Sequence, residues 1–245
     1  MDRPLTRGRS MFDISYITNL TPSTVITTSA KTASPLVRTL APTELPSERS
    51  ADRATLSTLS SQLNSSAVRA LARDANLNVK ELNALAKSIN DNIAGTHYYA
   101  HRALHDAEVP DTDDPALLER ARQATKFNNG SGANPFAGLP QDQLRLIMYD
   151  ESGDFTVNER SAASFENHIQ EQTWKAAICK RYTDEYNETG ESTQTLVMLL
   201  AHYDQLPPIE KAQYPANYAA TITSGDSSAM GIFSALKNQS GIQQT

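Results

Sequence analysis

The chain lacks several features that would fix its class at once. Its one cysteine, Cys179, cannot form a disulfide within the chain, so the fold has to rest on packing. No apolar run approaches the ~20 residues that a membrane-spanning helix needs, and no such run follows Met1 as a secretory signal. We therefore predict no membrane span, and either a cytoplasmic location or secretion without a cleavable signal peptide.

Positive charge is also scarce, and it is unevenly distributed. The net charge is −6, which argues against a nucleic-acid binder because such proteins normally present a basic face. Residues 1–43, however, carry five basic side chains against two acidic ones. The acidic excess belongs to the rest of the chain, which indicates that the two parts have different roles.

Sequence motifs of common enzyme classes are missing as well. The chain has no Walker loop, no GxGxxG, no GxSxG elbow and no CxxC. A nucleophilic Cys179 would need a nearby histidine and a lowered pKa, and an ordinary buried thiol explains the same residue. We predict no catalytic residue, and the sequence leaves the question of an enzyme open.

The first 51 residues are rich in serine, threonine and proline. Such a segment cannot bury enough apolar surface to offset the entropy of ordering it, so residues 1–51 are predicted to be a disordered tail. Only residues 11–17 alternate in the manner of a strand.

Helical periodicity begins at Asp52, and residues 52–220 are predicted to form an all-α domain, an irregular multi-helix bundle. The polar, glycine-rich stretch 128–138 indicates a loop and a candidate subdomain break. Residues 221–245 show only weak patterns. The longest helix is expected over 156–188, where it would span roughly 50 Å at the centre of the domain. Residues that cap helices stand at the expected boundaries: Asn78 with Glu81, Gly95, Asp114 before Pro115, Thr156 with Glu159, and Gly190.

The segment 150–161 lies between two predicted helices and resembles a calcium loop. EF-hand loops place oxygen ligands at alternating positions, a glycine at position 6 and a bidentate glutamate at position 12. Positions 1, 3, 5, 7 and 9 are filled by oxygen-bearing residues, namely Asp150, Ser152, Asp154, Thr156 and Asn158.

Two determinants of a calcium loop are nevertheless absent. Phe155 stands where the sharp turn needs glycine, Ser161 stands at position 12, and Glu159 comes two residues too early. A turn leading into a Thr156-capped helix explains the same residues without an ion. The sequence therefore predicts a calcium site that binds the ion weakly. Its ligands are Asp150, Ser152, Asp154, Thr156, Asn158 and Glu159.

Three histidines, His97, His101 and His105, recur every four residues in a segment with helical periodicity. An i, i+4 pair can chelate zinc or nickel, and a polar helix face explains the same spacing. The acidic segment 106–114 is interpreted as a solvated loop whose last aspartate caps a helix.

Four segments resemble an uncharacterised protein family common in pseudomonads: 134–140, 146–160, 186–190 and 210–218. The resemblance implies a bacterial source and no assigned reaction. Two hypotheses of function follow. The first is a non-enzymatic helical interaction protein with a protein partner, and its Ser/Thr-rich, weakly basic start resembles the export leaders of type III effectors and virulence factors. The alternative is a calcium-binding module at 150–161.

Overall fold

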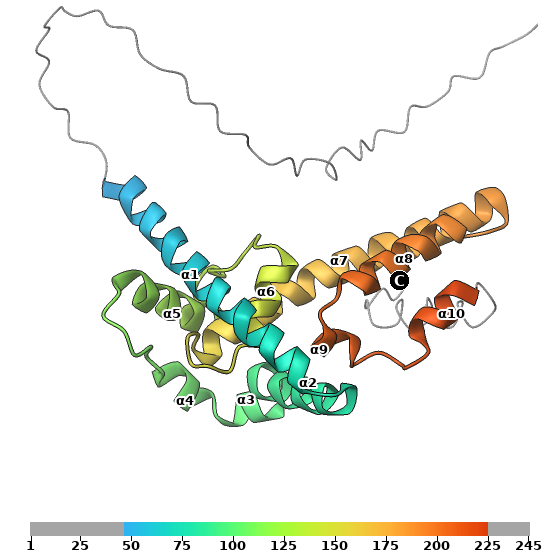
Figure 1. Ribbon diagram of the computed structural model, residues 1–245. Coiled ribbons are helices and arrows are strands. Elements are labelled where there is room, and N and C mark those ends of the chain that lie inside the picture. The colour runs from blue at the N-terminus through green and yellow to red at the C-terminus, as the bar shows by residue number, and fades with distance from the viewer. Residues whose placement is uncertain (1–46, 225–245) are drawn as a thin grey trace, which may run out of the picture. The chain divides into compact units, whose positions relative to one another are not determined.

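The computed structural model of the protein describes residues 47–224, with side chains described from Thr58 onward. Every regular element in this range is a helix, which confirms the predicted all-α class (Figure 1). The predicted strand-like segment 11–17 and most of the predicted tail and C-terminal segment lie outside the described residues.

The helices follow one another with short connections. Their bounds are α1 Ser47–Asn76, α2 Val79–Ala94, α3 Thr96–Ala100, α4 Arg102–Ala107, α5 Pro115–Asn128, α6 Gln141–Met148, α7 Val157–Thr189, α8 Thr193–Gln205, α9 Pro208–Lys211 and α10 Tyr218–Ser224. Helix α1 begins at Ser47, five residues before the predicted start at Asp52. Helix α10 likewise runs four residues past the predicted end of the domain.

Helix α7 is the central element of the domain, as predicted. Its 33 residues contact α2, α5, α6 and α8, while α1 packs on α5 and α6. The first half of α7 contributes Ala162 and Ala163 to a core that also contains Leu63, Phe136 and Ile147. Small residues on α7 allow the neighbouring helices to approach it closely, so the core forms around this half of the helix.

The predicted caps are present in the structure. Asn78 and Thr156 each form a capping box with the glutamate three residues on, and Asp114 accepts a hydrogen bond from the backbone of Ala116. Gly190 ends α7 with a φ of 80°, a left-handed conformation that suits glycine. Gly95 caps the end of α2 in an extended conformation.

Two predicted boundaries need correction. The connection between α5 and α6, residues 129–140, covers most of the predicted loop 128–138, but Phe136 from this connection is fully buried with Ala124 of α5 and Leu144 of α6. The core therefore continues across the loop, and no subdomain break occurs there. The segment of His97, His101 and His105, whose periodicity predicts one helix, is broken at His101, because its backbone leaves the helical region between α3 and α4.

A separate cluster of apolar and aromatic side chains holds α7, α8 and α10 together. Leu199 of α8 and Tyr218 and Ile222 of α10 are its buried members, with Trp174 and Cys179 of α7 against them. Among residues 47–224, no helix is long and apolar enough to cross a membrane.

Candidate functional site

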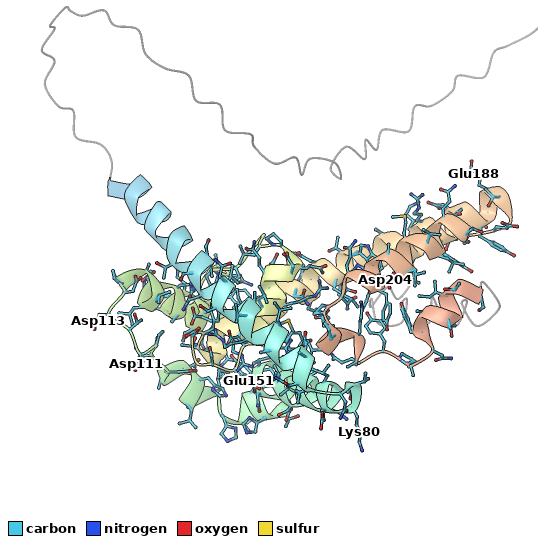
Figure 2. The ribbon with its side chains drawn as sticks, in the orientation of Figure 1. Lys80, Asp111, Asp113, Glu151, Glu188 and Asp204 are labelled. Carbon is cyan, nitrogen blue, oxygen red and sulfur yellow. The ribbon has the colours of Figure 1, made fainter. Side chains whose placement is uncertain are left out.

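The connection between α6 and α7 contains four of the six predicted ligands, Asp150, Ser152, Asp154 and Thr156, and Glu151 marks its position (Figure 2). Its turn is built by short-range hydrogen bonds: Asp150 Oδ1 accepts one from the backbone of Ser152 at 2.8 Å. The Ser152 hydroxyl accepts another from the backbone of Asp154. Gly153 has a φ of 91°, which permits the reversal of the chain.

A guanidinium from α1 occupies the centre of this turn. Arg69 Nη2 lies 2.6 Å from Asp150 Oδ2 and 2.5 Å from Asp154 Oδ2, so two loop carboxylates converge on one cationic nitrogen. Ser66 of α1 also donates to Asp150. Burial opposes ionisation of Asp150, but hydrogen bonds from Ser152, Ser66 and Arg69 outweigh it, and the pKa of this carboxyl is lowered.

The second half of the predicted ligand set faces elsewhere. Glu159 is fully buried and bonds the backbone of Thr156 at 2.9 Å and Arg120 Nε at 2.6 Å. Asn158 is also fully buried, where it accepts a hydrogen bond from the hydroxyl of Tyr98 at 2.8 Å. Helix α7 begins at Val157, before an EF-hand loop would end, and this early start turns both side chains into the core.

The structure thus brings Asp150, Ser152 and Asp154 together and separates them from Asn158 and Glu159, with Thr156 acting as the cap. Within the described range, no three histidine, cysteine, aspartate or glutamate side chains are arranged to hold a metal ion. Calcium binding at this loop stays a prediction. It requires the ion to displace Arg69 from its two carboxylates.

The three predicted histidines lie together at the junction of α3 and α4. The rings of His97 and His101 stack with centroids 4.1 Å apart, and His105 stacks on Tyr98 at 5.3 Å. Burial lowers the pKa of His105. The row of rings is therefore partly a packing surface for Tyr98.

A charged cluster that the sequence analysis missed joins four helices. Arg145 of α6 lies 2.8 Å from Glu210 of α9 and 3.9 Å from Glu171 of α7, and His202 of α8 lies 3.3 Å from Glu171. Burial raises the pKa of Glu210, against the attraction of Arg145. Burial also opposes ionisation of Glu171, but the adjacent His202 and the charge of Lys175 lower its pKa. These carboxylates are 39 residues apart in sequence, so no local spacing could have indicated the pair.

Cavities adjoin this cluster on two sides. One, of about 470 Å³, lies between α1 and α6, and the other, of about 330 Å³, lies between α7 and α9. Arg145 and Tyr149 line both. The arginines of the first cavity, Arg69, Arg73 and Arg145, each have carboxylate partners, so their charges are already neutralised by the fold.

Helix α1 has a second face that no other described helix covers. The exposed residues between 58 and 76 are uncharged; the side chain of the neighbouring Arg69 is 40% exposed, but it pairs with Asp150 and Asp154. We define the outer face of α1 by seven of these residues: Ser61, Asn64, Ser65, Val68, Leu71, Ala72 and Ala75. Val68 is 68% exposed and Leu71 is 73% exposed. Their spacing of three and four residues forms one continuous stripe along the helix.

The chain matches no family model, no curated protein and no solved structure. The resemblance to a pseudomonad family stays a prediction.

Proposed function

We propose that the protein is a non-enzymatic helical interaction protein whose partner binds the outer face of α1. The observation that supports this proposal is the apolar stripe of Val68, Leu71, Ala72 and Ala75 on a face with no charged residue among its seven members. Covering an uncharged face avoids the desolvation of charged groups, which is a large cost in buried interfaces.

The chemistry of the face also suggests the kind of partner. Its residues repeat every three or four positions, which is the spacing with which one helix packs against another. Alanine and serine flank the two larger side chains and permit close approach of a second backbone. The expected partner is therefore an amphipathic helix that places its own apolar residues around Val68 and Leu71.

The proposal is tested by comparing how much partner the wild type and its variants, each as the full chain, capture from a lysate of the source cells. The double variant Val68→Asp/Leu71→Asp puts two charges into the face, and we expect it to retain less than about a tenth of the captured partner. Val197→Asp is the matched control, because Val197 is 62% exposed on α8 and lies outside the face. Equal capture by the double variant and the wild type would refute the proposal.

The elution volumes of the purified wild type and double variant distinguish a foreign partner from a second copy of the chain. If the purified wild type elutes as a dimer and the double variant as a monomer, the partner helix is α1 itself. If both are monomers, the partner has to come from the lysate of the source cells.

Secretion through a type III apparatus extends the proposal, as an effector or virulence factor of a bacterium. The support is compositional: residues 1–50 are rich in serine and threonine, poor in acids and weakly basic. A reporter fused to residues 1–50 should be exported by a cell with such an apparatus and retained when the apparatus is inactivated. Retention in both cells would refute the secretion part of the proposal.

Calcium binding at 150–161 is a second candidate function, and one observation favours it. Asp150 and Asp154 already converge on a single cation, the Arg69 guanidinium. A calcium ion at this point has to compete with that arginine, so we expect weak binding in the wild type, toward the millimolar range.

Removal of the competing charge makes the calcium proposal testable. In Arg69→Gln, about 5 mM calcium should raise the melting temperature more than in the wild type, because a ligand that binds only the folded state stabilises it. Asp150→Ala should abolish the rise. An unchanged melting temperature in both the wild type and Arg69→Gln excludes the calcium site.

A further inference from the structure

A third cavity, of about 560 Å³, lies between α3, α5 and α7 and differs from the other two in its lining. Four aromatic rings line it, from Tyr98, Tyr99, Phe127 and Phe165. Phe127 and Phe165 meet edge to face with centroids 5.3 Å apart, and Tyr98 and Tyr99 do the same at 5.3 Å. We call it the aromatic cavity.

The rings at the edge of the aromatic cavity are open to solvent. Phe165 is 52% exposed and Tyr99 is 64% exposed, although both are large apolar side chains. Solvent-exposed aromatic rings beside a concavity are unfavourable in water and are typical of ligand sites. The volume falls within the range of about 300–1,000 Å³ that small-molecule sites occupy.

Charge distinguishes this cavity further. No carboxylate lines it, whereas acidic side chains line both of the others and the chain as a whole has a net charge of −6. Its ionisable lining besides the tyrosines consists of Arg102 and His168. The cavity therefore offers positive charge and aromatic surface together.

Arg102 is only partly engaged by the protein. Its Nη2 donates to the carbonyl of Asn128 and to the side chain of Asn129, and its Nε lies 4.0 Å from Asp106. Within the described part of the chain, no acceptor is hydrogen-bonded to Nη1. The side chain of Arg102 is about one-third exposed, and its guanidinium keeps donor capacity for an anion.

We propose that the aromatic cavity binds a small aromatic carboxylate, with the ring between Tyr99 and Phe165 and the carboxylate on Arg102. Aromatic ligands gain from edge and stacked contacts with these rings, and a charge-assisted hydrogen bond to the guanidinium selects the anion over a neutral analogue. This site does not depend on the outer face of α1.

Calorimetric titration of the full chain with 2-naphthoate and with the neutral 2-naphthamide tests the proposal. We expect the wild type to bind the carboxylate about tenfold more tightly than the amide, as a charge-assisted hydrogen bond requires. Phe165→Ala should weaken both probes several-fold. Val197→Ala, which truncates another exposed apolar side chain on α8, should leave both affinities unchanged.

Arg102→Gln separates recognition of the anion from a structural role. Within this one variant the ratio of the two affinities should fall to about one, and a ratio is insensitive to a general loss of stability. If the variant does not fold, the wild-type ratio and the Phe165→Ala result still decide. No binding at millimolar probe, equal wild-type affinities, or unchanged affinities in Phe165→Ala would each overturn the proposal.

Discussion

At the scale of single residues, the described domain is organised by arginines from one helix that pair with carboxylates on another. Arg120 of α5 is the most buried example: its Nε lies 2.6 Å from Glu159, and its guanidinium lies 5.1 Å from the ring of Phe155. A buried pair of this kind adds little stability over an apolar pair, but breaking it leaves an uncompensated charge. Each such arginine therefore fixes which helices pack together.

Two arginines on α5 provide a matched test of this statement. Arg120→Met should lower the free energy of unfolding by about 3–5 kcal/mol, because Glu159 stays buried without its partner. Arg122, two residues on, pairs with Glu119 at the surface, and Arg122→Met should cost less than about 1 kcal/mol. Urea denaturation measures both, and equal losses would contradict the assignment.

The two carboxylates near Arg145, Glu210 and Glu171, give a prediction about the dependence of stability on pH. Folding raises the pKa of Glu210, so its stabilising contribution is full below the ordinary value of 4.5 and is lost as pH rises through the folded value. Folding lowers the pKa of Glu171, so its contribution to stability is complete above the ordinary value of 4.5 and is lost as pH falls through the folded pKa.

Glutamine variants should therefore show opposite slopes. Above about pH 4.5, the stability of Glu210→Gln relative to the wild type should rise with pH, whereas below about pH 4.5 that of Glu171→Gln should fall as the pH rises. Thermal melts on both sides of pH 4.5 measure the two slopes. Slopes of the same sign would contradict the opposite pKa shifts of Glu210 and Glu171.

At the scale of elements, the ends of helices were predictable and their neighbours were not. Capping depends on residues within four positions, so Asn78, Thr156 and Gly190 could be identified from sequence. Phe165 and Ile169 lie at the i, i+4 spacing of an apolar face on α7, yet they are 52% and 45% exposed. Periodicity identifies an apolar face but does not show whether a neighbouring helix covers it.

The left-handed cap at the end of α7 gives an element-scale prediction. Gly190→Ala should destabilise the protein by about 1 kcal/mol, because a Cβ disfavours the φ of 80°. Gly190→Asn should cost less, since asparagine tolerates this conformation. A shift of the urea midpoint measures both, and a larger loss for asparagine than for alanine would contradict the role of the cap.

At the scale of the whole molecule, the all-α class and the central position of α7 could be predicted because they follow from periodicity and length. The candidate site could be predicted only in part. The spacing of Asp150, Ser152 and Asp154 brought these residues together, but Arg69 lies 81 residues from Asp150 in sequence and no local pattern pointed to it. Long-range pairs of single residues carry no period, so they become visible only in the fold.

The central claim is that the outer face of α1 binds a partner helix, and site-specific photo-crosslinking tests it most directly. A photoreactive benzoyl-phenylalanine is placed at Leu71, and in a second sample at Val197 on α8, which is exposed to a similar degree. The account predicts a covalent adduct of one defined mass from position 71 and none from position 197. An adduct from position 197 alone, or from neither position under conditions where the wild type captures a partner, would contradict it.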